Sequence, residues 1–431
     1  MNFIVTCFMN EIKKRKIMWL CNARFSKEKI RTTASWLQPL AECLQQSGKV
    51  DIVNVTTENV RQTVCEEIDG IKQYVLPMPS VSHYGQVPSR EFCFALSKIE
   101  EDVKPDLVHV WGTEGVWASA FQQGAIKTKA FLDIQGVLSS CFYYYYGGLT
   151  FWDLLRCVHL KEILMPWRNL CFKKRIFRKR GEVEIKAIKS FDTISYQSEW
   201  VHRHLSFVAP TARFIPTKIM LRKSFYTADA WKYKCSSDSP VVFTTASGSI
   251  PYKGIQVLMK SIQLVKDKYP GIQLRIAGNM HIGNRLQDGF SVYIQNLIKR
   301  LGIQDNVVEL GPIDETQIVK ELQGANVCVI PSFVETYCLA FAESMIVGTP
   351  TIASFAGAMP ELARHEEECL FYNSIDFQVC ASFIDRLVQD RSLAERLSEN
   401  GRARRMKEND MDTVVKTQLE IYNKVLENEH I

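Results

Sequence analysis

Residues 331–354, PSFVETYCLAFAESMIVGTPTIAS, decide the architecture of the second half of the chain. The strand-like run ANVCVIPS leads into this stretch, a helical segment expected to begin near Cys338 fills its middle, and TPTIAS ends it as a second strand. Strand, helix and strand in this order are typical of a parallel sheet with helices packed on its faces. Two carboxylates, Glu335 and Glu343, interrupt the apolar sequence eight positions apart.

The same alternation extends in both directions from this stretch. Short apolar runs typical of buried parallel strands cover residues 16–22, 49–56, 105–112, 129–136, 191–198, 241–249, 272–278 and 306–311. Helical patterns separate these runs, one of them over residues 33–46. Ser89 and Ser198 stand where a serine can cap the start of two further helices.

This pattern predicts an α/β protein of two Rossmann-like domains, each a doubly wound parallel sheet, which face each other across a cleft. We expect an N-terminal acceptor-binding domain over residues 1–225, a linker over 226–240, a C-terminal domain over 241–410 and a final helix over 411–431 that packs back towards the N-terminal domain. Open α/β sheets bind ligands beyond the carboxyl ends of their strands, so the cleft is the expected site.

The composition narrows the class of protein. Hydrophobic residues make up 46% of the 431 residues, as in a folded globular protein, and the net charge of +6 does not by itself indicate a nucleic-acid partner. The 13 cysteines include no C-x2-C pair, which argues against a zinc site or a disulfide framework. No apolar run reaches the ~20 residues of a membrane-spanning helix. We therefore expect a cytoplasmic protein.

The two carboxylates of the opening stretch lie where such a sheet binds ligands. Glu335 follows a strand at its carboxyl end, and Glu343 is expected inside the next helix. The N–H groups of Cys338 and Leu339 would point outward at the start of that helix, and such a terminus binds phosphate. A carboxylate within the helix can accept two hydrogen bonds from a ribose. The pair thus suits a nucleotide sugar, whereas either glutamate alone would be an ordinary residue near a helix start.

A further candidate for phosphate binding follows the first strand of the C-terminal half. In ASGSIPYKG, Gly248 permits a tight turn and Gly254 opens a helix. Lys253 stands at the start of that helix, where a cation is unfavourable unless an anion joins it. We expect Lys253 to bind a diphosphate; the alternative is a lysine in solvent.

Together these segments resemble the retaining, family-four glycosyltransferases with the GT-B fold, among them bacterial capsule, exopolysaccharide and lipopolysaccharide enzymes. The resemblance rests on E-x7-E at Glu335 and Glu343, on GTPTIAS and FAGAMPELA, and on the first-half segments PDLVHVWGTE and FLDIQGVLSS. It implies a nucleotide-diphosphate sugar donor, no required metal or other cofactor, and transfer with retention. By this likeness Glu335 contacts the transferred sugar, and the catalytic residues are Glu335 and Gln135. The donor-binding residues would be Glu343, Lys253, Gly248, Ser249, Thr336, Cys338 and Leu339.

The chain departs from the family pattern at four places. The loop after the first strand, SKEKIRTTASW, has no glycine, and Ser249 stands where an arginine is common. Cys338 replaces a usual glycine and Gln135 a common histidine. Gln135 can offer its amide to a sugar or phosphate oxygen but cannot carry a proton. The family implies a front-face mechanism, in which the leaving diphosphate accepts the acceptor proton and the protein supplies position and electrostatic stabilisation.

Residues 156–189 concentrate positive charge, with Lys173, Lys174 and Arg175 close to Trp167. A basic helix with interleaved aromatic and aliphatic side chains can lie on an anionic membrane. It can equally be a core helix with a solvated basic face.

The segment just before this basic stretch, CFYYYYGGLTFW, is aromatic. Tyr143 and Tyr144 can line an acceptor groove, because aromatic faces pack on sugar rings, or they can fill a corner of the core. His109 is expected to end a strand near the cleft.

The sequence thus predicts a hexosyltransferase that moves a sugar from a nucleotide-diphosphate sugar, with retention, onto a saccharide or lipid-linked saccharide in surface polysaccharide biosynthesis. It is expected in the cytoplasm, with an anionic membrane surface as an optional partner and no nucleic acid. The alternative is a degenerate member that binds a nucleotide sugar or a protein partner without transfer. A sugar-nucleotide epimerase of similar fold is disfavoured by the basic stretch and the aromatic residues.

Overall fold

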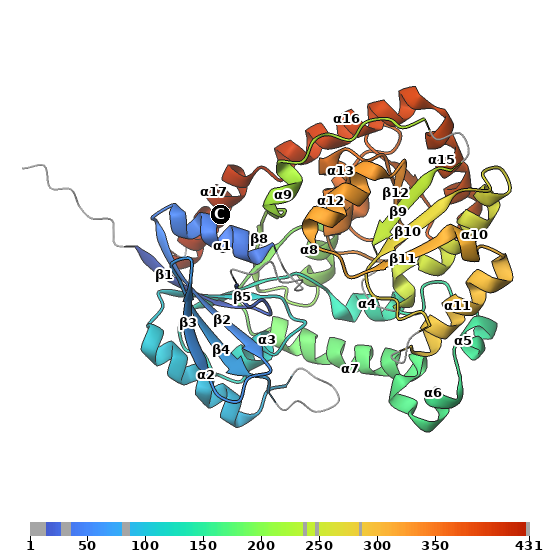
Figure 1. Ribbon diagram of the computed structural model, residues 1–431. Coiled ribbons are helices and arrows are strands. Elements are labelled where there is room, and N and C mark those ends of the chain that lie inside the picture. The colour runs from blue at the N-terminus through green and yellow to red at the C-terminus, as the bar shows by residue number, and fades with distance from the viewer. Residues whose placement is uncertain are drawn as a thin grey trace, which may run out of the picture.

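The computed structural model describes residues 14–26, 36–79, 87–235, 239–245, 250–283 and 287–427. Within these ranges the chain forms two sheets, one after the other along the sequence (Figure 1). The first described sheet has eight strands in the order β3-β4-β2-β1-β5-β6-β7-β8, and the second has six in the order β11-β10-β9-β12-β13-β14. Every neighbouring pair is parallel except β3 and β4. The predicted architecture of two parallel-sheet α/β units is confirmed.

The strands predicted from apolar runs are also confirmed. The first sheet consists of β1 (Arg15–Leu20), β2 (Val50–Glu58), β3 (Val64–Ile68), β4 (Ile71–Pro77), β5 (Leu107–Trp111), β6 (Ala130–Asp133), β7 (Thr193–Tyr196) and β8 (Arg213–Pro216). The second consists of β9 (Val241–Thr245), β10 (Gln273–Ala277), β11 (Val307–Gly311), β12 (Val327–Ile330), β13 (Thr351–Ser354) and β14 (Leu370–Tyr372).

The hairpin of β3 and β4 at one edge of the first sheet was not predicted from the sequence. Its turn consists of Asp69 and Gly70, whose φ angles are both positive, at 50° and 79°. Two consecutive positive φ angles are typical of the tight hairpin turn for which Asp-Gly is a favoured pair. This dipeptide was therefore the available signal.

Helices cover both faces of each sheet (Figure 1). Those of the N-terminal unit are α1 (Leu37–Gln46), α2 (Arg90–Val103), α3 (Trp117–Gln122), α4 (Leu138–Tyr144), α5 (Phe151–Arg156), α6 (Leu160–Leu164), η1 (Pro166–Arg168), α7 (Leu170–Ile188), α8 (Glu199–Ser206) and α9 (Lys223–Tyr226). Those that follow are η2 (Pro251–Lys253), α10 (Ile255–Lys266), α11 (Gly289–Leu301), η3 (Gln304–Asn306), α12 (Glu315–Gly324), α13 (Leu339–Val347), α14 (Met359–Leu362), α15 (Phe377–Gln389), α16 (Arg391–Glu408) and α17 (Met411–Leu426). Ser89 and Ser198 cap α2 and α8 as predicted, since each side chain accepts a hydrogen bond from a first-turn N–H group.

The last helix, α17, crosses from the second unit to the first and packs beside α1 (Figure 1). The hydroxyl of Tyr422 accepts a hydrogen bond from Trp19 Nε1 (2.9 Å) and lies 3.1 Å from His109 Nδ1. His109 is fully buried between the rings of Trp111 and Phe131. The expectation that His109 ends a strand near the cleft is wrong: it lies in the middle of β5, and burial lowers its pKa well below the ordinary value.

The segment from α4 to α7 belongs to the N-terminal half of the sequence but lies along both units (Figure 1). Tyr145, Cys157 and Leu170 are buried in the same hydrophobic cluster as the core of the second sheet. Gly289 begins α11 without a Cβ, which would overlap the carbonyl oxygen of Cys157. Residues between α4 and α7 therefore tie the two units together.

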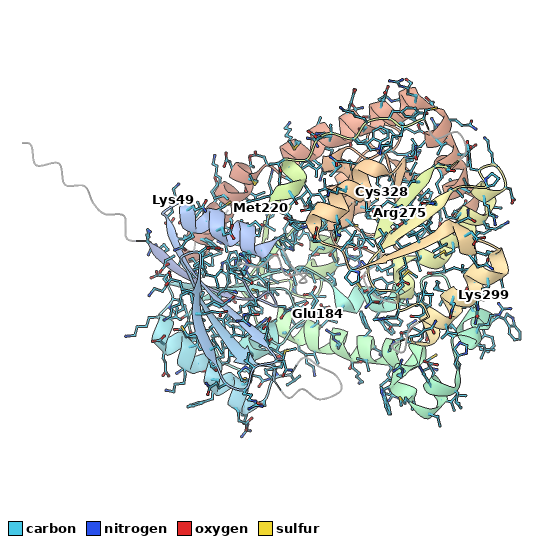
Figure 2. The ribbon with its side chains drawn as sticks, viewed as in Figure 1. Lys49, Glu184, Met220, Arg275, Lys299 and Cys328 are labelled. Carbon is cyan, nitrogen blue, oxygen red and sulfur yellow. The ribbon has the colours of Figure 1, made fainter. Side chains whose placement is uncertain are left out.

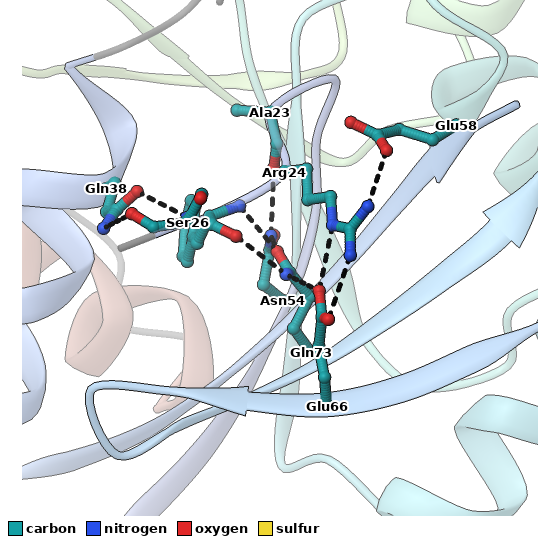
Figure 3. Close-up of polar contacts among 9 residues, drawn as sticks. Ala23, Arg24, Ser26, Gln38, Asn54, Glu58, Glu66 and Gln73 are labelled. Carbon is teal, nitrogen blue, oxygen red and sulfur yellow. Dashed lines mark hydrogen bonds and ion pairs between the residues drawn. The ribbon is translucent and has the colours of Figure 1, made fainter. Parts of the chain in front are cut away.

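The segment that leaves β1 is fixed by a polar network (Figure 3). Arg24 donates to both oxygens of Glu66, at 2.9 Å each. Asn54 donates to Gln73, whose side-chain oxygen also accepts from the N–H group of Phe25 (2.7 Å for both bonds). Side chains thus hold the chain where it enters the glycine-free loop SKEKIRTTASW at Ser26. The rest of that loop, residues 27–35, lies outside the described residues.

Candidate functional site

Glu335 and Lys253, which separate motifs singled out, lie together in the structure. Glu335 stands in the loop between β12 and α13, and Lys253 ends η2. Lys253 Nζ lies 2.7 Å from Glu335 Oε1, and both side chains are largely buried. Burial alone would lower the pKa of Lys253, but the Glu335 carboxylate and Tyr252 outweigh it and hold that pKa above its ordinary value. The site therefore contains a lysine that stays charged.

Two glycines let neighbouring segments approach the loop that carries Glu335. Gly254 has φ +76°, and a Cβ there would overlap the carbonyl oxygen of Pro331. Gly357 of the FAGAMPELA segment has φ +56°, and a Cβ there would overlap the Glu335 carbonyl oxygen. The same carbonyl accepts a hydrogen bond from the N–H group of Ala358 (2.9 Å). Each glycine therefore allows a separate segment of the chain to pack directly against the loop that carries Glu335.

Glu343 lies inside α13 and is buried. Arg222 donates to its Oε1 atom through Nε (3.0 Å) and Nη2 (2.7 Å). Burial raises the pKa of Glu343, and the Arg222 charge opposes this rise. Arg222 immediately precedes α9 in the connection between the two units. Arg222 was not predicted from the sequence, because a single arginine in an irregular stretch carries no pattern.

The start of α13 has an unusual backbone. Cys338 precedes the helix with φ 77° and ψ 81°, in the left-handed region, and Leu339 is the first helical residue. Such a conformation is easy for glycine and costs about 1–2 kcal/mol for other residues. Cys338 therefore has a backbone conformation that suits glycine, and it adds a buried side chain beside Glu335 and Lys253.

The loop after β12 also contacts the carboxyl ends of the N-terminal strands. The Thr336 hydroxyl donates to the carbonyl of Gln135, which follows β6 (2.6 Å). The Thr336 carbonyl accepts from the Ser198 hydroxyl, which follows β7 (2.8 Å). The strand ends of the two sheets therefore face each other, and Thr336 uses its side chain for the contact between the units.

A carboxylate of the second unit caps a helix of the first. Glu361 accepts hydrogen bonds from the N–H groups of Glu199 and Trp200, both at 2.7 Å. These groups belong to the first turn of α8, where a negative charge is electrostatically favourable. The contact fixes the segment that carries Gly357 and Glu361 against the N-terminal unit.

Carboxyl groups are also buried at the strand ends of the N-terminal unit. Asp133, the last residue of β6, accepts hydrogen bonds from Ser195 Oγ (2.7 Å) and Gln197 Nε2 (2.6 Å). Burial raises the pKa of Asp133 to about 7. It likewise raises the pKa of Glu114, in the loop after β5, to about 7. Both stand in segments that carry the resemblance, PDLVHVWGTE and FLDIQGVLSS, but nothing in the sequence indicated that these two acids are buried.

Glu184 of α7 is turned towards α4 (Figure 2). It accepts hydrogen bonds from the Thr113 hydroxyl (2.6 Å) and from the N–H groups of Leu138 (3.0 Å) and Ser139 (2.8 Å). Because Leu138 begins α4, the carboxylate fixes the position of this helix. Gln135 lies just before α4, and its Nε2 donor is buried with no hydrogen-bond partner among the residues that the structure describes.

The C-terminal half matches a known family. Residues 229–404, which include Lys253, Glu335 and Glu343, match the model described as "Glycosyl transferases group 1". Residues 229–404 are a group 1 glycosyl transferase domain.

Curated relatives align with less than half of the chain. The chain is 26% identical over 186 residues to the MMP alpha-(1->4)-mannosyltransferase of Mycolicibacterium hassiacum, a region of 43% of each chain. It is 27% identical over 152 residues to the D-inositol 3-phosphate glycosyltransferase of Corynebacterium glutamicum, 35% of each chain. The aligned regions thus span less than half of the length of these relatives.

Solved structures resemble the whole chain. The sucrose-phosphate synthase of Thermosynechococcus elongatus superimposes with a TM-score of 0.72 at 17% identity, over 96% of this chain and 100% of that one. The Anabaena HepE protein, solved in complex with UDP-glucose, superimposes with a TM-score of 0.67 at 13% identity, over 95% and 99%. These similarities show the fold: the group 1 glycosyl transferase domain and the N-terminal unit together form the GT-B arrangement.

The remaining predicted residues fall in three places. Gly248 and Ser249 lie outside the described residues. Tyr143 and Tyr144 are exposed on α4, and Trp167 is exposed in η1. The basic residues of α7 are mostly engaged: Lys173 pairs with Asp288 at 2.6 Å, and Lys174 Nζ lies 4.1 Å from the ring centre of Tyr146, whereas Arg175 is exposed.

Among the described residues, no group of three or more His, Cys, Asp and Glu side chains is placed to hold a metal ion. None of the described helices is both long and apolar enough to cross a membrane.

Proposed function

We propose that the chain is a retaining hexosyltransferase that moves a sugar from a nucleotide-diphosphate sugar onto a saccharide or lipid-linked saccharide in the synthesis of a surface polysaccharide. The observation that carries this proposal is the arrangement around the start of α13. Lys253, at the end of η2, pairs with the largely buried carboxylate of Glu335 in the loop after β12. The helix that follows this loop supplies its N-terminus and the buried carboxylate of Glu343. Each of these groups matches one part of a nucleotide sugar.

Lys253 and the N–H groups of Cys338 and Leu339 would hold the diphosphate, because both supply positive charge. Glu343 would accept hydrogen bonds from the ribose, and Glu335 would contact the transferred sugar. Glu335 and Glu343 now pair with Lys253 and Arg222. A bound diphosphate would share the charge of Lys253 with Glu335, so that the carboxylate could turn towards the sugar.

The transfer would proceed on one face of the sugar. The bond between the anomeric carbon and the diphosphate oxygen breaks as the acceptor hydroxyl oxygen attacks from the same side, and the hydroxyl proton passes to the leaving diphosphate. Lys253 and the start of α13 would stabilise the negative charge of that leaving group. With this charge on the protein, we propose that no metal ion is required.

The relatives support a nucleotide-sugar donor. One is named a mannosyltransferase and another a D-inositol 3-phosphate glycosyltransferase, and HepE was solved with UDP-glucose. Titration calorimetry of the full chain with UDP, GDP, UDP-glucose and GDP-mannose, with and without EDTA, tests the donor class. We expect one nucleotide to bind without added metal. Failure of all four to bind would contradict the proposal, and NMR of a transferred sugar would show whether its anomeric configuration is retained.

The alternative, a degenerate protein that binds a nucleotide sugar without transfer, is favoured by Cys338. Its side chain is buried at the start of α13, where glycine would leave more room for phosphates. Slow release of nucleotide diphosphate from a donor that binds would distinguish an enzyme from such a protein.

We also propose that the protein works in the cytoplasm, attached peripherally to the inner face of the cell membrane. The membrane contact predicted from the sequence was the basic stretch that forms α7. Lys173 pairs with Asp288 and Arg180 donates to the carbonyl of Glu114, so parts of this helix serve the fold itself. The apolar residues that precede α7 offer a better surface.

A further inference from the structure

More than half of the large hydrophobic side chains that are exposed among the described residues lie between Tyr143 and Trp167. Most belong to α5, α6 and η1. Figure 1 shows α5 and α6 at the edge of the molecule beside α11. We call the following set the α5–η1 surface: Phe151, Trp152, Leu155, Val158, Leu160, Ile163, Leu164, Met165 and Trp167. Single exposed apolar residues are normal, but a contiguous set marks an interaction site.

The helices of the α5–η1 surface have almost no buried residues. Neither α5 nor η1 contains a buried residue, and α6 buries only Glu162. Leu160 and Leu164 of α6 are each 69% exposed. Helices this short are not stable alone in water and normally depend on an apolar face packed against something else. Here the apolar residues face outward.

The charge around the α5–η1 surface has one sign. Residues 143–180 contain nine Lys and Arg but only two acids, Asp153 and Glu162. Asp153 caps α5 by accepting from the N–H group and the hydroxyl of Thr150, and Glu162 is buried. Arg156, Lys161 and Arg175 are exposed on or near the same helices. Within residues 143–180, an anionic surface would therefore meet basic residues and no outward-facing acid.

The surface is held firmly by the rest of the molecule. The carbonyl of Cys157, between α5 and α6, touches Gly289 of α11, and Arg168 Nη2 donates to the carbonyl of Gln287 (2.9 Å). A face that is rigid, apolar, rich in tryptophan and rimmed by basic residues has the composition of an interfacial membrane anchor.

We propose that the α5–η1 surface docks the protein on an anionic lipid bilayer, with Trp152, Leu164 and Trp167 inserted at the level of the headgroups. The basic residues around it would contact the lipid phosphates.

The docking surface is connected to the candidate donor site through α4. The segment between α4 and α5 packs on the second unit, where a Cβ at Gly148 would press on the ring of Phe333. Within α4, burial raises the pKa of the Cys141 thiol to about 12, and the Glu335 carboxylate adds to this rise. A bilayer under α5 and α6 would present a lipid-linked acceptor along α4, past Tyr143 and Tyr144. Docking on the bilayer does not depend on the proposed sugar transfer. Only the route for a lipid-linked acceptor along α4 rests on that proposed function.

Co-sedimentation of the full chain with vesicles tests the docking. The vesicles contain phosphatidylcholine alone or together with phosphatidylglycerol, at low and high salt. We expect binding to the anionic vesicles that weakens with salt. The triple variant Trp152→Ser, Leu164→Ser, Trp167→Ser should lower the partition coefficient about tenfold or more, because three apolar anchors are removed.

Phe207→Ser is the matched control, since Phe207 is 93% exposed just after α8 and lies outside the α5–η1 surface. It should bind vesicles like the wild type. Circular dichroism and UDP or GDP titration would check that the triple variant is folded. Because vesicle binding is measured without any sugar transfer, a failure of the proposed transfer would leave the vesicle result intact. Absence of binding to anionic vesicles at low salt, or equal binding by the triple variant and the wild type, would overturn the proposal. Concentration-dependent dimers that the triple variant abolishes, without vesicle binding, would assign the surface to a second copy instead.

Discussion

Buried carboxylates on the two sides of the boundary between the units are held by different chemistry. In the group 1 glycosyl transferase domain, Glu335 pairs with Lys253 and Glu343 with Arg222. At the strand ends of the N-terminal unit, Asp133 is bound by a hydroxyl and an amide, and Glu184 by a hydroxyl and backbone N–H groups.

This difference indicates two roles for the carboxylates: those in ion pairs can change partner, and those held by neutral donors support the fold. A cation that pairs with a carboxylate can change partner when a ligand brings its own charge, so both ion pairs suit a site that binds phosphates. Neutral donors cannot gain from such an exchange. Asp133 and Glu184 therefore act as fixed parts of the fold that hold β7 to β6 and α4 to α7. If this contrast is correct, variants on the C-terminal side change binding and turnover, and variants on the N-terminal side change stability.

The largest effect is expected for Glu335→Gln. If Glu335 contacts only the transferred sugar, turnover should fall by about two to three orders of magnitude, as for the loss of one electrostatic group in an active site. Affinity for the nucleotide diphosphate should hold or rise, because Lys253 loses a competing anion. Steady-state kinetics and titration calorimetry measure the two quantities separately.

The matched control for this variant is Glu321→Gln. It breaks the ion pair with Arg275 (2.6 Å), which joins α12 to β10 within the same domain and does not involve the start of α13. Equal losses of turnover in both variants, or a parallel loss of nucleotide affinity in Glu335→Gln, would show that Glu335 supports the structure.

Glu343→Gln should weaken the binding of donor and free nucleotide diphosphate alike. Losing a charged acceptor of two ribose hydrogen bonds costs about 1.5–3 kcal/mol. Arg222→Gln should act through the same carboxylate. Burial raises the pKa of Glu343 and Arg222 opposes this, so the variant should lose nucleotide affinity at a higher pH than the wild type as the pH falls. Calorimetry across a pH series measures this shift, and an unchanged pH profile would remove Arg222 from the site.

These residues also show how far the sequence could predict the site. Glu335, Cys338 and Glu343 lie within one loop and helix, so their spacing alone placed them together. Lys253 and Glu335 are 82 positions apart, and only the likeness to a family joined them. Arg222 is 121 positions from Glu343 in an irregular connection, where neither periodicity nor spacing indicates a partner.

The N-terminal side was less predictable for a physical reason. Asp133 looked like an ordinary strand end in KAFLDIQG, because burial and neutral donors come from segments more than 60 residues away. The exposed apolar residues of α5 and α6 could not be told from core residues in the sequence, since their hydrophobicity is the same in either place. The fold, in contrast, was predictable because each buried parallel strand is a local apolar run.

Asp133→Asn should change stability in a pH-dependent way. The carboxyl titrates at about 7 in the folded chain and near 3.9 when unfolded. The folded state therefore binds more protons between these values, and the free energy of unfolding falls as the pH rises through them. Asn keeps the shape and cannot ionise, so relative to the wild type the variant should gain on the order of 2 kcal/mol between about pH 5 and about pH 8.

Urea unfolding at both pH values measures this gain. Asp267→Asn replaces an exposed aspartate after α10 and should show no such dependence. The same gain in both variants would mean that burial of Asp133 is not its cause. A loss of turnover in Asp133→Asn without a change in stability would break the contrast between the two sides.

The smallest effect is expected at Cys338, where a single substitution acts on both stability and nucleotide binding. Cys338→Gly relieves a positive φ that costs about 1 kcal/mol, but it also makes the unfolded chain more flexible by a similar amount, so stability should change little. Nucleotide affinity should rise a few-fold, because the start of α13 becomes more accessible to phosphates. Cys338→Ala removes the sulfur yet keeps the strained backbone and a Cβ, so it separates the two causes. A gain in both variants would assign the effect to the volume of the thiol, and a gain in Cys338→Gly alone would assign it to the backbone. Calorimetry that finds no gain in either would show that phosphates do not approach α13 at this residue.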